Sequence, residues 1–201
     1  MIKNIINSFL AGVAISIGGF AFLSSDNKVI GAFLFSIGLF LICTMGYNLF
    51  TGKVCYIFSS KEINLPFIGI VLLMNFVGTF LMGMLTKLIK PELVEVANNI
   101  CSKKLNEGFA VIPLGILCNV LIFYAVHEYA RNAHELGKYL AIVMCVVVFI
   151  LCGFEHCIAN MYYFSVADFS RGTIGYLLMN ILGNAIGGIG IYRLDNLRTR
   201  D

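Results

Sequence analysis

Six long stretches without a charged residue divide this chain, and they constrain its fold more than any other feature. They cover residues 4–25, 29–52, 63–86, 108–126, 139–154 and 172–192. Most are close to the roughly 20 residues that span a bilayer. Hydrophobic residues make up 59% of the chain and charged residues only 12%, whereas a soluble domain has about 25% charged residues. The sequence therefore predicts an all-α membrane protein with six transmembrane helices in a single domain, residues 1–201.

Three short sequence matches indicate an internal repeat. They pair LLMNFVG at 72–78 with LLMNILG at 177–183, Gly46 with Gly153, and Gly12 with Gly115, at offsets of 105, 107 and 103. A unit of three spans is odd, so its second copy would lie inverted in the membrane. We therefore expect one repeat over residues 1–90, a hydrophilic linker over 91–107 and a second repeat over 108–201. This architecture is typical of channels and transporters.

The second and fifth apolar segments are too long for one straight span. They run from residue 29 to about 60 and from residue 139 to about 167, and glycine and polar residues interrupt both near the middle. Each is predicted to be a broken helix, with a short loop between two half-helices. The second halves would begin near Thr51 and Cys157, with both N-termini directed at the membrane centre. Helix N-termini carry partial positive charge and free N–H groups, which favours a small anion there.

Two adjacent ionisable residues, Glu155 and His156, lie inside the fifth apolar segment. A charge at the centre of a membrane helix costs about 2.5–3.5 kcal/mol on insertion scales, so both residues need a partner, water or a neutral form. For Glu155 we expect a structural role, with its carboxylate bonded to loop amides or to Lys53. For His156 we expect a functional role as a cation or proton donor, because the unperturbed pKa of histidine is about 6.5.

The other polar residues of the apolar segments fall into two groups. Those in or near the breaks are candidate pore residues, with bonding between helices as the alternative: Asn48, Thr51, Asn119 and Asn160. Asn75 and Asn180, which the repeat relates, are expected to hold the helices together. Gly183 and Gly187 form a GxxxG pattern, which indicates close helix packing or a subunit contact.

Several functional classes find little support in the sequence. His127 and His134 are seven residues apart and match no metal-ligand spacing, so we expect neither a metal nor a cofactor. No basic run indicates nucleic acid, and no nucleophile elbow, phosphate-binding loop or dinucleotide fingerprint indicates an enzyme. A membrane-embedded enzyme or haem protein using the three histidines is a remote alternative. An aquaporin-like channel for neutral solutes is the nearer one, although neither half contains Asn-Pro-Ala.

Four blocks of sequence resemble the signature segments of the formate/nitrite transporter family: LFTGK at 49–53, LGILCN at 114–119, GFEHCIANMY at 153–162 and LGNAIGG at 182–188. The resemblance implies an aquaporin-like fold of six helices in two inverted repeats. It also implies a homopentamer with one pore in each subunit. Members of the family carry small monovalent anions such as formate, nitrite, hydrosulfide or lactate.

The resemblance also assigns roles along the expected pore. His156 is similar to the central histidine of the family, and Thr51 and Asn119 to polar residues near it. Four apolar residues resemble constrictions: Phe35, Leu39, Leu49 and Phe149. Lys103 or Lys104 resembles a vestibule lysine that collects anions. Protonation of the anion by or through His156 would let a neutral acid cross the dry constrictions.

The expected location is the plasma membrane, with the bilayer, protons and a small anion as partners. Charged residues hardly orient the chain, because the two sets of loops carry seven and six basic residues. The basic cluster from Arg193 to Arg200 follows the last helix directly, which favours cytoplasmic termini. The first apolar stretch is too long for the apolar region of a signal peptide, so it is taken as the first helix.

Overall fold

A computed structural model describes residues 1–59, 62–168 and 170–198, and the regular elements in these ranges are all helices. They are α1 (Ile2–Leu23), α2 (Lys28–Met45), α3 (Phe50–Val54), α4 (Leu65–Ile89), α5 (Leu93–Leu105), the short 3₁₀ helix η1 (Gly108–Ala110), α6 (Val111–Arg131), α7 (Glu135–Leu151), α8 (Cys157–Val166) and α9 (Thr173–Arg198). Helices α1, α2, α4 and α9, and α6 together with η1, are long and apolar enough to cross a membrane. The prediction of an all-α membrane protein is confirmed for the described residues.

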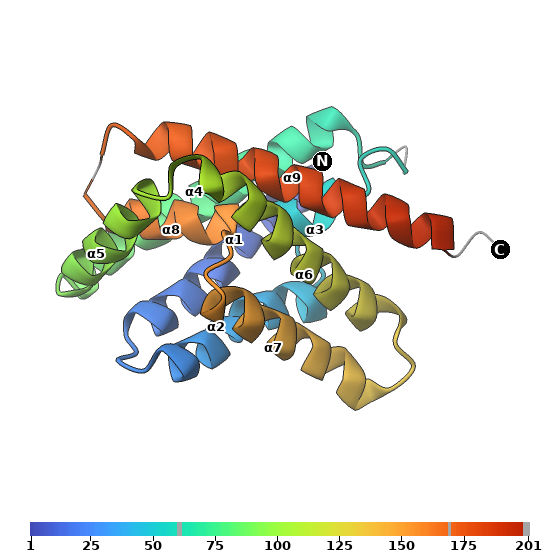
Figure 1. Ribbon diagram of the computed structural model, residues 1–201, viewed down its shortest axis with the longest axis horizontal. Coiled ribbons are helices and arrows are strands. Elements are labelled where there is room, and N and C mark those ends of the chain that lie inside the picture. Colours follow the sequence, from blue (N-terminus) through green and yellow to red (C-terminus); the bar gives the residue numbers. More distant parts are fainter. Residues whose placement is uncertain (60–61, 169, 199–201) are drawn as a thin grey trace.

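The connections between helices gather at two opposite ends of the molecule (Figure 1). Helix α5, the α1–α2 connection and the α8–α9 connection lie at one end, which we call the α5 end. The α6–α7 connection and the end of α9 lie at the other, which we call the α6–α7 end.

The two halves of the chain pack by the same scheme. Helix α1 packs on α2 and α4, and α6 packs on α7 and α9. The short helices then cross over, because α8 packs on α4 of the first half and α3 packs on α9 of the second. The start of each short helix is therefore surrounded by helices from both halves.

Glycines end α2 and α7 in the same backbone conformation. Gly46 has φ 70° and Gly153 has φ 72°, a left-handed conformation that glycine adopts without the steric cost of a side chain. Just beyond them, the Tyr47 amide donates to the Ile42 carbonyl at 3.0 Å and the Phe154 amide to the Phe149 carbonyl at 2.9 Å. The two glycines paired in the sequence repeat thus occupy equivalent turns.

One asparagine side chain in each half holds the beginning of a short helix. The Oδ1 atom of Asn75 accepts the Phe50 amide, and Oδ1 of Asn184 accepts the Cys157 amide, each at 2.8 Å. The sequence match had paired Asn75 with Asn180. The backbones keep this register, since a Cβ atom on Gly78 would lie 2.5 Å from the Phe9 carbonyl oxygen and one on Gly183 would lie 2.5 Å from that of Ile112. The bonds equivalent to those of Asn75 are nevertheless made by Asn184, one helical turn beyond Asn180. Asn180 instead donates to the Glu155 carbonyl at 2.7 Å.

The GxxxG pattern brings α9 against α6 within the same chain. A Cβ atom placed on Gly183 would lie 2.5 Å from the Ile112 carbonyl oxygen, and one on Gly187 would meet the Ile116 carbonyl oxygen. Only glycine permits so close an approach of two backbones. The expectation of close packing is confirmed, and these glycines face α6 rather than a neighbouring subunit.

Candidate functional site

The first turns of α3 and α8 bring a buried threonine and a buried histidine together. Thr51 lies at the start of α3, and His156 is the residue before α8. Their side chains meet, with Oγ1 of Thr51 3.0 Å from Nε2 of His156, although 105 residues separate them in sequence. Both residues are almost completely buried. Two of the predicted pore residues therefore form one polar pair.

The second ring nitrogen of His156 caps α8. Its Nδ1 atom accepts the Ala159 amide at 3.1 Å, so Nδ1 carries no proton in this arrangement. The hydrogen of a neutral ring is then on Nε2, which donates to Thr51 and leaves the threonine hydroxyl hydrogen free to donate elsewhere. A cationic ring would lose the bond to Ala159. The geometry therefore favours a neutral donor over the cation that the sequence also allowed.

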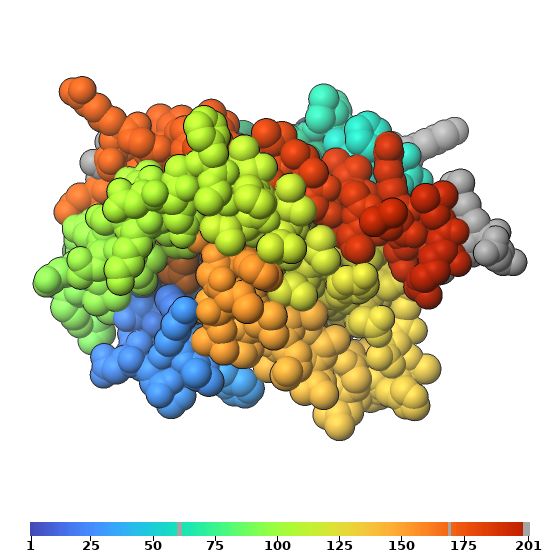
Figure 2. Space-filling model, viewed as in Figure 1, coloured from blue at the N-terminus to red at the C-terminus, as the bar shows by residue number. Residues whose placement is uncertain are grey.

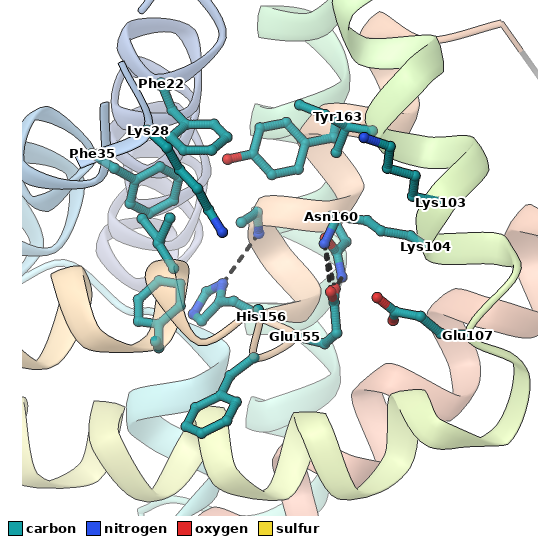
Figure 3. A pocket seen from close by; sticks show the side chains of 16 residues that line it. Phe22, Lys28, Phe35, Lys103, Lys104, Glu107, Glu155, His156, Asn160 and Tyr163 are labelled. Atoms are coloured by element: carbon teal, nitrogen blue, oxygen red, sulfur yellow. Dashed lines mark hydrogen bonds and ion pairs between the residues drawn. The ribbon is translucent and has the colours of Figure 1, made fainter. Parts of the chain in front are cut away.

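A cavity of about 390 Å³ opens from the α5 end and reaches His156. In Figure 2 its mouth is the hollow where α5, the start of α2 and the end of α7 meet. Five charged residues line it: Lys28, Lys103, Lys104, Glu107 and Glu155. Three are basic and two acidic, so the lining carries one net positive charge. We call this space the first cavity (Figure 3).

Glu155 lies in the wall of the first cavity, in an ion pair with Lys104. The Nζ atom of Lys104 lies 2.6 Å from both carboxylate oxygens, and only 2% of the Glu155 side chain is exposed. Nδ2 of Asn160 donates to the same carboxylate at 2.6 Å. The expectation of loop amides or Lys53 as the carboxylate's partner was therefore wrong. Of the two candidate vestibule lysines, Lys104 is largely neutralised by this pair, and Lys103 remains exposed.

Two charged residues of the first cavity, Lys28 and Glu107, were missed by the sequence analysis. Lys28 begins α2, and its Nζ atom donates to the Leu151 carbonyl at the end of α7 at 3.3 Å. Figure 3 shows it reaching toward His156 from the side opposite α5. Glu107 follows α5 and accepts the Tyr176 hydroxyl at 3.2 Å. Neither residue lies in a recognisable motif. Their positions as charged residues beside the ends of apolar segments were the only signal in the sequence that could have found them.

Apolar side chains bound the polar pair on both sides. Phe35 and Phe149 meet edge to face with ring centroids 5.9 Å apart, and Phe149 stacks on the His156 ring at 5.9 Å. Both phenylalanines line the first cavity. Leu39 and Leu49 are also buried, and Leu49 lines a separate cavity that opens toward the α6–α7 end. Of the predicted constriction residues, Phe35 and Phe149 thus lie in the wall of the first cavity and Leu49 in that of the other, whereas Leu39 lines neither.

The remaining asparagines lie around this centre. Asn160 lines the first cavity. The backbone amide of Asn48 donates to the Asn7 carbonyl of α1 at 3.2 Å. Asn119 is fully buried and donates to the Asn184 carbonyl at 2.7 Å, while its Oδ1 atom has no hydrogen-bond partner among the described residues. Asn119 lines neither cavity, and its role beside the permeant stays a prediction.

The two histidines of the hydrophilic loop have separate surroundings. Nε2 of His127 lies 3.6 Å from the Asp195 carboxylate of α9, whereas His134 is the residue before α7 and is exposed. In residues 1–59, 62–168 and 170–198, no cluster of histidine, cysteine and acidic residues could hold a metal ion.

The fold has close counterparts among solved structures. An "FNT family ion channel" superposes with a TM-score of 0.90 at 23% sequence identity, covering 100% of this chain and 91% of the other. A "pentameric formate channel with formate bound" gives a TM-score of 0.82 at 24% identity, covering 97% of each chain.

Sequence relatives are proteins of membrane transport. The transporter YrhG of Bacillus subtilis is 29% identical over 82% of this chain and 68% of its own length. Formate channel BtFdhC of Bacillus thuringiensis is 28% identical over 81% of this chain and 70% of its own length. Nitrite transporter NirC of Escherichia coli is 28% identical over 91% of this chain and 78% of its own length. These relatives are transporters and channels, not enzymes. The formate/nitrite transporter family model matches residues 1–194, and the chain therefore belongs to the formate/nitrite transporter family.

Proposed function

We propose that this protein conducts small monovalent anions of weak acids across the membrane, past the Thr51–His156 pair. The observation that carries the proposal is this buried donor pair, which lies between two cavities that open toward opposite ends of the molecule. Similarity to a formate channel and a nitrite transporter supports the substrate class. Formate, nitrite and hydrosulfide are the candidate anions.

Selection of the permeant would occur in two steps. The net positive lining of the first cavity concentrates anions near His156, because charge in a cleft with low-dielectric walls raises the local concentration of counter-ions. The aromatic pair Phe35–Phe149 and the leucines then exclude a full hydration shell, which would leave the anion to replace its lost water by other donors. The Nε2–H group of His156 and the Thr51 hydroxyl are the donors present there.

The finer part of the proposal concerns the proton. A bare anion loses much hydration free energy between apolar walls, whereas a neutral acid loses far less. Protonation of the anion by or through His156 would lower this barrier. Because Nδ1 accepts the Ala159 amide, the neutral ring cannot give up its Nε2 proton without becoming an imidazolate. To donate a proton outright, the ring would first have to take one up at Nδ1 and lose the bond to Ala159. While the ring stays neutral, its Nε2–H group hydrogen-bonds the anion, and the proton that joins the anion comes from water on the side of uptake. One proton would accompany each anion, taken from the side of uptake and released on the far side.

For the architecture, we infer six membrane segments in two inverted repeats with an aquaporin-like arrangement. Helix α7, with 17 residues, would supply the sixth segment. Helices α2 with α3 and α7 with α8 would be two broken segments, each interrupted at its left-handed glycine. Both termini would face the cytoplasm, in the plasma membrane. The resemblance to a pentameric channel supports a homopentamer with one path in each subunit.

Flux in proteoliposomes tests this function directly. Uptake of labelled formate should depend on the protein and rise with an inward proton gradient. His156→Phe should abolish uptake, and His134→Ala should serve as the matched control because His134 is exposed outside both cavities. Unchanged uptake and unchanged pH dependence in His156→Phe would overturn the proposal.

Two further measurements define the substrate. Counterflow of formate against nitrite and hydrosulfide ranks the anions in one preparation. Osmotic swelling with glycerol or water tests the alternative of a neutral-solute channel. Swelling without anion flux would favour that alternative.

A further inference from the structure

The cavity that opens toward the α6–α7 end contains a lysine that the pathway described above does not use. This second cavity has a volume of about 260 Å³ and is enclosed by α2, α3 and the end of α6. Ile42, Leu49, Tyr56 and Tyr129 contribute to its walls, together with Lys53 from α3. Leu49 is two residues from Thr51, so this cavity approaches the polar pair from the side opposite the first cavity.

Lys53 is half-buried in this wall, and within residues 1–59, 62–168 and 170–198 its charge has no partner. Among the described residues, no carboxylate lies within 4.0 Å of its ammonium group, and no side-chain hydrogen bond is formed. The lining of the second cavity also contains no aspartate or glutamate. A half-buried cation without a counter-charge is unfavourable unless water or an anion compensates it.

The contrast with Lys104 strengthens this point. Lys104 lines the first cavity but is held 2.6 Å from both oxygens of Glu155. Because Lys104 and Asn160 satisfy that carboxylate, Lys53 is not needed as its partner. The charge of Lys53 therefore remains available to a ligand that enters the second cavity.

We propose that Lys53 forms an anion-binding site in the second cavity, taking small monovalent carboxylates and oxyanions. The tyrosines in the same walls can add hydroxyl donors to such a ligand. The inference rests on the proposed anion conduction and gives it a second collecting site, on the other side of the Thr51–His156 pair. Each mouth of the path then has its own basic residue.

Sided transport measurements test this site. Labelled formate uptake is measured in intact cells and in inside-out vesicles from the same cells, in a host without its own formate transporters. Lys53→Gln should raise KM by about tenfold at low ionic strength in one of the two preparations only, the low end of the effect that charge in a cleft has on local anion concentration. Lys103→Gln, which removes a charge from the first cavity, should raise KM in the other preparation.

Three controls keep the result specific. Lys53→Arg should restore the normal KM, because the positive charge is retained. Lys3→Gln removes an exposed lysine of α1 that lines neither cavity, and should change nothing. Added salt should reduce the effect of Lys53→Gln, because the Debye length is only about 8 Å at physiological ionic strength and charges farther apart than this are largely screened.

The outcomes separate this site from the proposed function. An unchanged KM in Lys53→Gln, or equal changes in both preparations, would overturn the binding site while the anion pathway stands. Absence of flux in the unaltered protein would overturn the anion pathway itself, and the site with it.

Discussion

Asn75 and Asn184 make the same set of hydrogen bonds from opposite halves of the chain. Each Oδ1 atom accepts the first amide of a short helix, and each Nδ2 atom donates to two backbone carbonyls. The carbonyls belong to Ser8 and Asn48 in one half and to Gly115 and Glu155 in the other. Thr51 and His156 are therefore positioned by a side chain from a neighbouring long helix.

Replacement of either asparagine should destabilise the protein. Asn184→Ala removes three buried hydrogen bonds, and we expect a loss of roughly 2–4 kcal/mol, because each buried polar group left without a partner costs about 1–3 kcal/mol. Thermal unfolding in detergent measures the effect as a lower Tm. Asn4→Ala, at an exposed position, is the control. Equal Tm values for the two variants would contradict the role of Asn184.

The hydroxyl group of Thr51 should contribute to formate flux through its hydrogen bonding and not through the size of the side chain. Thr51→Val keeps the size of the side chain but removes the donor, and we expect formate flux about tenfold lower, which corresponds to about 1.4 kcal/mol. Thr51→Ser should retain most of the flux because it keeps the hydroxyl. The hydroxyl would be irrelevant to the path if the valine variant transported as well as the serine variant.

The Lys104–Glu155 pair should show strong coupling. Lys104→Met leaves a buried carboxylate with Asn160 as its remaining side-chain donor, and breaking a buried ion pair costs about 3–5 kcal/mol. The double variant Lys104→Met, Glu155→Gln removes both charges and should recover much of the lost Tm. A double-mutant cycle measures the coupling, and additive effects of the two changes would refute it.

Acidification should increase anion capture through Glu107, which lies between α5 and η1. Burial raises the pKa of this carboxyl above its ordinary value, and the negative charge of Glu155 raises it further. As the pH falls through this raised pKa, Glu107 becomes neutral and the first cavity more positive. The flux ratio of Glu107→Gln to the unaltered protein should therefore exceed one at neutral pH and fall toward one on acidification. Protonation of the substrate itself affects both proteins equally, and a ratio independent of pH would exclude the effect.

Close contact between α6 and α9 predicts a sharp difference between two glycines of one helix. Gly183→Ala places a methyl group 2.5 Å from a carbonyl oxygen, whereas Gly190→Ala meets no atom within 4 Å. Overpacking of this kind costs about 1–3 kcal/mol. We expect a lower Tm for Gly183→Ala only, and equal stability of the two variants would argue against the packing.

Local sequence patterns predicted the positions of the long helices and their breaks. What they did not predict depends on contacts between residues far apart in the sequence. Gly46 and Gly153 mark the turns because glycine alone adopts their backbone conformation without strain, and such signals are local. The match between Asn75 and Asn180 did not reveal which asparagine of α9 holds the start of α8. Asn184 lies one turn beyond the matched window, and only the packing of α9 against α8 brings its side chain to the Cys157 amide.

Among the site residues, too, those in distinctive motifs were predicted and those that depend on long-range contacts were not. His156 and Thr51 were found because their motifs are distinctive, yet the cap formed by Nδ1 was not foreseen. The partner of Glu155 is 51 residues away on α5, and only the packing of α5 against α8 brings Lys104 to it. Lys28 was missed because a single lysine at the start of a helix cannot be distinguished, in the sequence alone, from any other charged residue of a loop.

The bond from the Ala159 amide to His156 has a consequence for how the path can open and close. Because the ring is part of the first turn of α8, it cannot rotate without loosening that turn. On the proposed path, this centre would therefore be a fixed part of the helix framework rather than a moving gate. Regulation of passage would have to act on the lysine side chains at the two mouths or on the aromatic pair beside the ring, which can change conformation while the helices stay in place.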